Sequence, residues 1–495
     1  MYYTSTRGDS QRCLSAEAIR RGLAPDGGLY LPVDCPRLTL EDISALCGMD
    51  YPTRAAKILS LFLTDYPAEK LNAFTRAAYG SKFPSPCAAP VKSIGDGLHI
   101  LELFRGPTSA FKDMALQMLP LLMTEAQRMD GIREETLILT ATSGDTGSAA
   151  MTGFTDVPGT RICVFYPYGG TSVIQRLQMT ASPGKNVCAV AVNGNFDDAQ
   201  RGVKTIFSDK AYAEELLKKG IRLSSANSIN WGRLVPQIAY YFSAYAELLR
   251  AGSIRLGDEI LIDVPTGNFG NILAARYAKA MGLPVKKLIC ASNRNDVLTD
   301  FFTTGVYNRN RPFYRTESPS MDILVSSNLE RLLYLLSEGD TAFVSQCMRA
   351  LNGEGSYTVP ETVSEALQKE FCAYSVNSDG TAAAIRSCFT ERGYLLDPHT
   401  AVAYAAAERY RAETEDTTPI VIAATASPYK FPRSVLTALS HPVPEDEFAM
   451  LEALAAYSGT EIPKNLAALK NAPERFTSCV EKDGLKGAID AFLAR

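Results

Sequence analysis

Short apolar runs alternate with longer helical patterns over most of the chain after residue 90. Five runs rich in Ile, Leu, Val and Ala are typical of buried strands: residues 136–140, 161–166, 187–192, 260–264 and 420–424. Helical patterns such as those of residues 235–250 and 272–281 lie between them. Near-continuous apolar strands separated by helices indicate parallel sheets covered on both faces. We therefore expect an α/β protein with two open twisted sheets and a cleft between them.

The N-terminal region has a different pattern. Its helical segments are joined by turns rich in Pro and Gly, and residues 82–90, which contain three prolines, indicate a domain boundary. We expect a mostly helical N-terminal domain at residues 1–90 and a small α/β domain at residues 136–230. Residues 91–135 and 231–495 are expected to form the large α/β domain.

Composition and charge exclude several classes of protein. The 495 residues are 46% hydrophobic and 21% charged with a net charge of −4, as in a globular protein of two or three domains. No Lys/Arg block interleaves with aromatic residues, so nucleic-acid binding is not expected. No apolar run reaches transmembrane length, and no signal peptide is apparent. The 11 cysteines form no Cys-x-x-Cys pair, which is typical of reduced thiols in the cytoplasm. A metal is not expected, because the three histidines lack ligand spacing.

A glycine-rich turn follows the strand at residues 260–264 and opens a helix. Gly267 and Gly270 allow neighbouring N–H groups to turn toward one point, and the helix start adds its positive end. These features predict a phosphate-binding cup made without Lys or Arg. The cup residues are Gly267, Asn268, Phe269, Gly270 and Asn271. A tight turn that serves packing alone is the alternative.

Lys112 is the candidate catalytic residue. It lies where a turn at residues 106–111 runs into a helical stretch, and its neighbours Phe111 and Met114 are apolar. Most lysines near a helix start are solvated, but an amine withdrawn from water loses basicity from its usual pKa of ~10.4 and attacks an aldehyde more readily. A lysine that forms a Schiff base and a cup that binds a phosphate are what an enzyme using pyridoxal 5′-phosphate requires.

Two other strands also end in polar turns. Residues 142–148 could bind a carboxylate or phosphate at a helix start, although a helix capped by Ser143 or Asp145 explains them equally well. Thr425 ends the strand at residues 420–424, where its hydroxyl can contact a ligand ring, and Ser427 could cap the following turn.

A fourth polar segment, residues 224–233, contains Asn227, Ser228 and Arg233. These side chains offer donors for an oxyanion, and the Arg guanidinium suits phosphate geometry. A polar surface loop with a solvated arginine is the alternative.

Six segments of the chain, in order, resemble the threonine synthase family in its longer class, whose members are fold-type II pyridoxal phosphate enzymes with a tryptophan synthase β-like fold. They are residues 3–8, 22–32, 106–113, 143–147, 225–230 and 267–270. Six motifs in register are a strong signal. Two positions depart from the family pattern, since Arg105 and Ser427 stand where the family usually has His. The roles of those two histidines therefore do not transfer to this chain.

The resemblance implies a carbon–oxygen lyase acting on phosphates, which converts O-phospho-L-homoserine and water to L-threonine and phosphate by γ-elimination and β-addition. It implies that Lys112 holds pyridoxal 5′-phosphate and transfers protons, that residues 267–271 bind the cofactor phosphate, and that Thr425 faces the pyridine nitrogen while Asp145 lies near the ring hydroxyl. It assigns the substrate carboxylate to Ser143 and Thr146. It assigns the substrate phosphate to Asn227, Ser228 and Arg233.

Three alternatives stay open. A threonine synthase-like phospho-lyase, or a lyase of the threonine dehydratase type, would give 2-oxobutyrate instead of threonine. A non-catalytic protein that retains the scaffold is the third alternative, and the intact Lys112 and phosphate cup argue against it. The sequence is compatible with a monomer or a homodimer.

Overall fold

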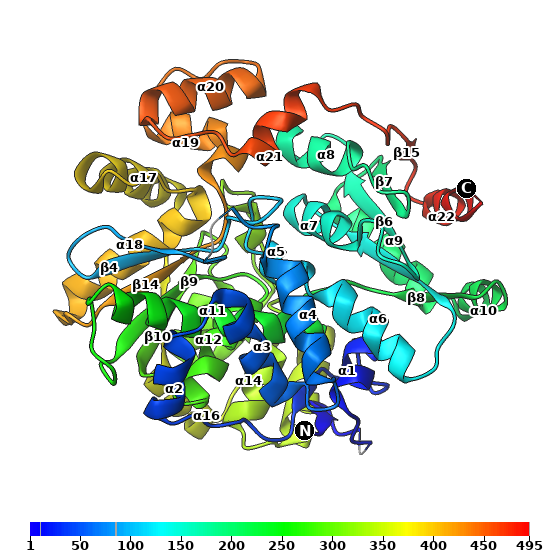
Figure 1. Cartoon of the computed structure of the whole chain (residues 1–495), viewed down its shortest axis with the longest axis horizontal. Coiled ribbons are helices and arrows are strands. Elements are labelled where there is room, and N and C mark those ends of the chain that lie inside the picture. Colours follow the sequence, from blue (N-terminus) through cyan, green and yellow to red (C-terminus); the bar gives the residue numbers. More distant parts are fainter. Residues whose placement is uncertain (10, 85–86, 495) are drawn as a thin grey trace.

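Two large sheets, each with helices packed against it, form the body of the protein (Figure 1). The computed structural model describes residues 1–9, 11–84 and 87–494. Residues 85 and 86 of the predicted boundary segment and residue 495 of the predicted large domain therefore lie outside the described part. The expected α/β architecture with two open sheets is confirmed.

The N-terminal region is mostly helical, as its sequence predicts. A two-stranded antiparallel sheet of β1 (Tyr3–Ser5) and β2 (Tyr30–Pro32) accompanies four helices. These are α1 (Ser15–Arg21), α2 (Leu40–Cys47), α3 (Tyr51–Phe62) and α4 (Ala68–Tyr79). Helices α2 and α3 begin at Thr39 and Asp50, whose side chains accept hydrogen bonds from the first turn. Both helices pack against α11 (Trp231–Arg250), so the N-terminal region is fixed to the helix that carries Arg233.

The larger sheet has six strands in the order β13–β10–β9–β14–β4–β3. Their bounds are β13 (Phe371–Ser375), β10 (Val285–Ser292), β9 (Ile260–Pro265), β14 (Ile420–Ala424), β4 (Leu98–Glu102) and β3 (Val91–Ser93). Only the edge strand β3 runs antiparallel to its neighbour. Val421 and Ile422 of β14 enter two different hydrophobic cores, because successive side chains of a strand point to opposite faces. Both faces are therefore buried.

Helices cover the two faces of this sheet. One core includes side chains of α11, α12 (Gly270–Ala280), α13 (Val297–Thr304), α14 (Leu329–Leu336), α15 (Thr341–Gly353) and α16 (Glu361–Glu370). The other includes side chains of α17 (Ser378–Arg392), α18 (Pro398–Thr414), α19 (Pro432–Ala438), α20 (Glu447–Ser458) and α21 (Lys464–Ala467). A short antiparallel pair, β11 (Val306–Asn308) and β12 (Ser356–Thr358), lies outside the sheet, as do the 3-10 turns η1 (Pro319–Met321), η2 (Pro428–Lys430) and η3 (Ala468–Asn471).

The smaller sheet has five strands, all parallel, in the order β15–β7–β6–β5–β8. Their bounds are β15 (Cys479–Val480), β7 (Val187–Val192), β6 (Thr160–Pro167), β5 (Glu135–Ala141) and β8 (Ile221–Ser224). The accompanying helices are α5 (Asp113–Leu116), α6 (Leu119–Met129), α7 (Asp145–Phe154), α8 (Val173–Thr180), α9 (Phe196–Ser208), α10 (Lys210–Lys218) and α22 (Leu485–Leu493). All five strands predicted from apolar runs are present, in β5, β6, β7, β9 and β14.

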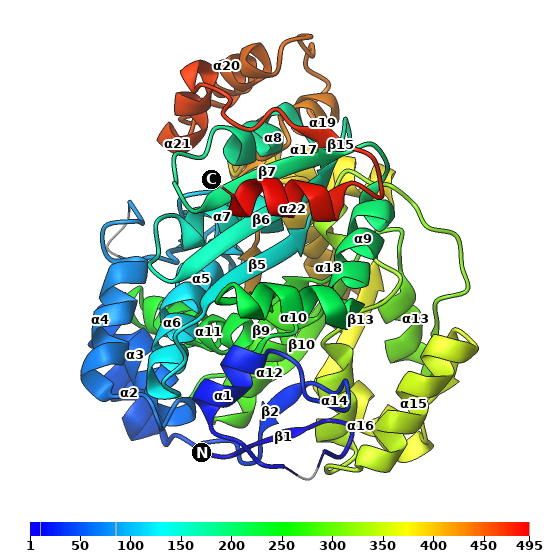
Figure 2. The ribbon, with the colours of Figure 1, turned by 90° about the vertical axis from the view of Figure 1, so that its right-hand side faces the viewer.

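The C-terminus differs from the sequence prediction. Residues 231–495 were assigned to the large domain, yet β15 pairs with β7 and the red helix α22 lies beside the smaller sheet (Figure 2). The two-residue strand β15 carries no periodic signal, so its pairing depends on tertiary packing. The remaining domain boundaries stay a prediction. No helix in the described residues is long and apolar enough to cross a membrane.

Candidate active site

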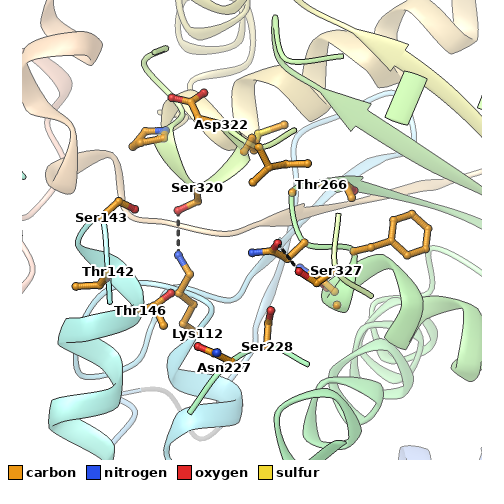
Figure 3. Close-up of a pocket in the computed structure, with 18 of the residues that line it drawn as sticks. Lys112, Thr142, Ser143, Thr146, Asn227, Ser228, Thr266, Ser320, Asp322 and Ser327 are labelled. Carbon is orange, nitrogen blue, oxygen red and sulfur yellow. Dashed lines mark hydrogen bonds between the residues drawn. The ribbon is translucent and has the colours of Figure 1, made fainter. Parts of the chain in front are cut away.

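A cavity of about 360 Å³ lies at the carboxyl ends of strands from both sheets. The turns after β5, β9 and β14 each contribute to its wall, as ligand sites of open α/β sheets generally do. Twelve of the predicted site residues line this one cavity (Figure 3). They are Lys112, Ser143, Thr146, Asn227, Ser228, Arg233, Gly267, Asn268, Phe269, Gly270, Asn271 and Thr425. The thirteenth, Asp145, is buried and contacts Lys112.

The turn that carries Lys112 is fixed to the end of β14. Phe111 donates its backbone N–H to the carbonyl of Thr425 at 2.8 Å. The Asp113 carboxylate accepts hydrogen bonds from the Thr108 N–H and hydroxyl at 2.8 and 2.7 Å. Lys112 therefore starts α5 from a rigid turn, and its side chain, 12% exposed, extends into the cavity wall.

The Lys112 amine is less basic than a free lysine. Burial lowers the pKa of Lys112 to about 8, and the positive charges of Lys430 and Arg233 act in the same direction, while Asp145 partly opposes them. Its Nζ donates to the Ser320 hydroxyl at 2.9 Å and lies 3.7 Å from Asp145 Oδ2. An amine with this pKa exchanges protons readily near neutral pH, as a general acid or base requires.

Asp145 is a buried, charged carboxylate. Lys430 Nζ lies 2.6 Å from Asp145 Oδ1, and Gln175 donates to the same oxygen at 3.0 Å. Burial alone would raise the pKa of Asp145, but Lys430 and Lys112 outweigh it and hold that pKa well below its usual range.

The start of α7 excludes the capping alternative. Neither Ser143 nor Asp145 caps this helix, because Asp145 is already its first residue and faces Lys430. The Thr142 hydroxyl accepts instead, from the N–H groups of Gly144 and Gly147 at 2.9 Å. Ser143 and Thr146 stay free to face the cavity. Ser427, in contrast, caps η2 as predicted, by accepting from the Tyr429 N–H.

The turn at residues 267–271 has the geometry of an anion cup. Ser326 donates its hydroxyl to the Gly267 carbonyl at 2.6 Å, and Asn328 donates its N–H to the Asn268 carbonyl at 3.1 Å. Because each peptide N–H points opposite to its carbonyl, the next two N–H groups face away from residues 326–328. The first N–H groups of α12 also lack intrahelical partners. A Cβ at Gly267 would lie 2.5 Å from the Ser320 carbonyl, so the turn requires glycine there.

Arg233 is a buried cation beside this cup. It is 3% exposed, and its Nη1 donates to the Ala226 carbonyl at 2.6 Å. Its buried Nε has no hydrogen-bond partner, and no carboxylate in the described chain pairs with the guanidinium. Burial lowers the pKa of Arg233 to about 10, so the group stays charged at neutral pH. An unpaired buried guanidinium in a cavity wall suits an anionic ligand.

Three residues near Lys112 were not predicted from the sequence. Ser320 and His399 line the cavity, and Lys430 is fully buried behind it. Lys430 could have been identified from its place in the polar turn after β14. No local sequence pattern identifies Ser320. The two positions where the family usually has His do not line the cavity. Arg105 is partly exposed and pairs with the buried Glu102, and Ser427 caps η2.

Comparisons with known proteins agree with this geometry. Residues 2–79 match the family model for the threonine synthase N terminus, residues 84–426 the model for pyridoxal-phosphate dependent enzymes, and residues 400–489 the model for the threonine synthase C-terminal region. The chain belongs to the threonine synthase family. The predicted family, the fold-type II architecture and the cofactor pyridoxal 5′-phosphate are thereby confirmed.

The chain is similar to members of this family along most of its length. A Schizosaccharomyces pombe threonine synthase is 38% identical over 88% of this chain and 89% of its own, and a Pseudomonas aeruginosa threonine synthase is 38% identical over 88% and 90%. The human protein threonine synthase-like 1 is 40% identical over 90% of this chain, which spans 60% of that protein's length. The crystal structure of threonine synthase from Brucella melitensis with bound pyridoxal phosphate superposes with a TM-score of 0.89 at 38% identity, covering 99% of this chain and 98% of that one.

The residues in the cavity fit the cofactor of the family. Its aldehyde requires an amine, which Lys112 would supply, and its phosphate requires donors, which the N–H groups of the turn at residues 267–271 would supply. Lys112 and Asn268 line the same cavity, and the amine is shielded from bulk solvent. The hydroxyl of Thr425, which also lines the cavity, would offer an uncharged partner to the ring nitrogen of the cofactor.

Proposed function

We propose that this chain is a threonine synthase, which converts O-phospho-L-homoserine and water to L-threonine and phosphate. The observation that carries the proposal is the coexistence in one cavity of a lysine with a lowered pKa and two groups that suit an anion. The cup at residues 267–271 is one of them, and the unpaired guanidinium of Arg233 is the other. A cofactor phosphate needs only one of them, so the second supports a substrate with its own phosphate.

We assign the cofactor contacts as follows. Lys112 holds pyridoxal 5′-phosphate, which, when bound, withdraws electrons from the substrate and so allows C–H bonds to be broken. The N–H groups of residues 267–271 bind its phosphate. Thr425 offers a neutral hydroxyl to the ring nitrogen, and Asp145 lies near the ring hydroxyl, where Lys430 keeps the carboxylate charged.

The substrate is held at both ends. Ser143, Thr146 and the N-terminus of α7 bind its carboxylate, since hydroxyls and free N–H groups at a helix start favour an anion. Asn227, Ser228 and Arg233 bind its phosphate. These two contacts fix the carbon chain between them, which places the Cα and Cβ protons within reach of one base. Lys112, with a pKa of about 8, removes and returns these protons.

The binding partners, the cellular compartment and the oligomeric state are also proposals. We propose a small-molecule substrate and no nucleic-acid or membrane partner, with the protein in the cytoplasm as a monomer or homodimer. The net charge of −4 and the lack of a membrane-crossing helix in the described residues support this assignment.

The decisive experiment is incubation of the purified protein, loaded with pyridoxal phosphate, with O-phospho-L-homoserine. We expect equal amounts of phosphate and threonine. Lys112→Ala should lower turnover by more than about 10³-fold and abolish the absorbance of covalently bound cofactor, because no amine is left to hold it or to move protons. Lys92→Ala, which changes an exposed lysine of β3, is the matched control.

Each other product pattern contradicts the proposal in its own way. Phosphate released together with 2-oxobutyrate would identify a phospho-lyase. Turnover of unphosphorylated threonine alone would identify a dehydratase-type lyase. A colourless protein that does not bind the cofactor would indicate a non-catalytic member of the family.

A further inference from the structure

Ser320 lies directly against the amine that the proposed reaction uses. It belongs to η1, in the loop between β11 and α14, and stands 208 residues from Lys112 in the chain. Lys112 Nζ donates to Ser320 Oγ at 2.9 Å (Figure 3). The same hydroxyl donates to Asp145 Oδ2 at 3.5 Å. The Ser320 hydroxyl therefore bridges the amine and the carboxylate.

The backbone of Ser320 is held in place by a buried histidine. Its N–H donates to His399 Nε2 at 3.2 Å, so the proton of this imidazole is on Nδ1. That Nδ1 lies 2.8 Å from Asp397 Oδ1, which fixes the orientation of the ring. His399 and Asp397 are both almost fully buried.

The rest of the loop is fixed as well. Asp322 accepts hydrogen bonds from the Thr316 hydroxyl at 2.7 Å, from Asn293 at 2.8 Å and from Asn295 at 3.0 Å. The loop also packs against the cup, because the Ser320 carbonyl faces Gly267 at a distance that leaves no room for a Cβ. The hydroxyl thus has a defined position relative to both the cup and the amine.

Asp145 is poorly placed to hold the amine alone. It lies 3.7 Å from Lys112 Nζ, which exceeds hydrogen-bond distance, whereas Lys430 Nζ lies only 2.6 Å from its other oxygen. A lysine side chain has about 2 kcal/mol of rotamer entropy, so an amine that is not held samples several positions. Proton transfer requires a donor–acceptor distance of about 2.6–3.2 Å.

We propose that Ser320 is a positioning residue, which holds the Lys112 amine by a hydrogen bond beside Asp145 while that amine transfers protons. The inference rests on the proposed role of Lys112. The charged and titratable groups that face the amine are Asp145 on α7, Lys430 on η2 and Arg233 on α11, with His399 behind Ser320.

The test compares three variants with two measurements. The first measurement is kcat and KM for O-phospho-L-homoserine with the loaded enzyme. The second is the pH dependence with which an amine-specific reagent modifies Lys112 in the full chain freed of cofactor, followed by mass spectrometry. Ser320→Ala should lower kcat by about 10–100-fold, the scale of a small misplacement of a reacting group, and change KM by less than about threefold. The pH of half-maximal modification should fall, because the ammonium loses an acceptor.

Two variants serve as controls. Ser320→Thr retains the hydroxyl and should recover kcat to within about threefold of wild type. Ser318→Ala removes a buried hydroxyl from the same loop, one that contacts Asn293 and not Lys112, and should leave the modification profile unchanged. If Ser320→Ala does not fold, Ser320→Cys preserves the volume with a weak acceptor and takes its place.

The proposal is overturned if Ser320→Ala leaves both kcat and the modification profile unchanged, or if Ser318→Ala reproduces both effects. A wild-type protein that forms no threonine would instead refute the proposed function. The modification profile would still report on Ser320 in that case, so the two failures are distinguishable.

Discussion

Two buried carboxylates, Asp145 and Asp263, differ in their partners and therefore in their charge. Both are almost inaccessible to solvent, at 4% and 0% exposed. Asp145 lies beside the cavity, with Lys430, Lys112 and Gln175 around it. Asp263 lies in the middle of β9, and neither of its oxygens has a hydrogen-bond partner in the described chain. Burial raises the pKa of Asp263 well above its usual value, whereas Lys430 and Lys112 hold the pKa of Asp145 low.

Depth of burial alone therefore does not determine the charge of a carboxylate in this protein. The carboxylate beside the cavity keeps its charge through Lys430 and Lys112, whereas burial raises the pKa of the carboxyl in β9. Arg233 is another buried group beside the cavity. No carboxylate among the described residues pairs with it, yet it stays charged at neutral pH. Substitutions at these three positions test the comparison.

The largest effect is expected for Asp145→Asn. This change leaves Lys430, which is fully buried, without its carboxylate. Removal of one partner from a buried ion pair typically costs about 3–5 kcal/mol. We expect the denaturant concentration at the midpoint of unfolding to fall accordingly. The pKa of Lys112 should also fall further below about 8, because the opposing negative charge is lost.

The control for Asp145→Asn is the double variant Asp145→Asn, Lys430→Met. Removal of both charges should restore most of the lost stability, since the penalty comes from the unpaired charge and not from the loss of the pair itself. Additive destabilisation in the double variant would show that the ion pair does not account for the stability of this region.

The elements that the sequence predicts are those with long local patterns. All five apolar runs form strands, and the helical patterns at 235–250 and 272–281 lie in α11 and α12. The edge strands β8 and β15 have four and two residues, and β8 is only half-buried. Such short edge strands have no alternation to detect, and their pairing is set by neighbours far along the chain.

The same distinction applies to the site. The cup and Lys112 are each visible as a local motif, because a glycine-rich turn or a lysine in an apolar turn has a physical meaning by itself. Ser320, Lys430 and His399 become meaningful only when residues far apart in the chain meet, as Ser320 does with Lys112 at 208 positions and with His399 at 79. The alternative in which Ser143 or Asp145 caps α7 is excluded for a related reason, since the cap rule treats the helix in isolation while Asp145 pairs with Lys430.

The next largest effect is expected for Arg233→Met. If this guanidinium binds the substrate phosphate, its loss removes charge-assisted hydrogen bonds of about 1.5–3 kcal/mol. The KM for O-phospho-L-homoserine should rise by about 10–100-fold, with a smaller change in kcat. Arg276→Met is a suitable control, because Arg276 is half-buried on α12 and pairs with Glu370 outside the cavity. An unchanged KM in Arg233→Met would count against the phosphate contact.

A pH-dependent effect, which tests the raised pKa of the carboxyl in β9, is expected for Asp263→Asn. An aspartate in the unfolded chain has a pKa of about 3.9, while that of Asp263 in the folded protein is well above this value. Below about pH 3.9 this carboxyl is protonated in both the folded and the unfolded chain, so its ionisation does not change the free energy of unfolding. Above it the unfolded chain releases a proton that the folded chain retains, so stability falls by about 1.4 kcal/mol per pH unit until the folded pKa is reached.

Asparagine does not titrate, so the stability of Asp263→Asn relative to wild type should increase by this amount with each pH unit above 4, up to the pKa of Asp263 in the folded protein. Denaturant midpoints at pH 5, 6 and 7 measure the trend. Asp379→Asn, at an exposed position of α17, should show no comparable trend. A stability difference between Asp263→Asn and wild type that stays constant over this range would mean that Asp263 is ionised in the fold. The contrast with Asp145 would then lie in their partners alone and not in their charge.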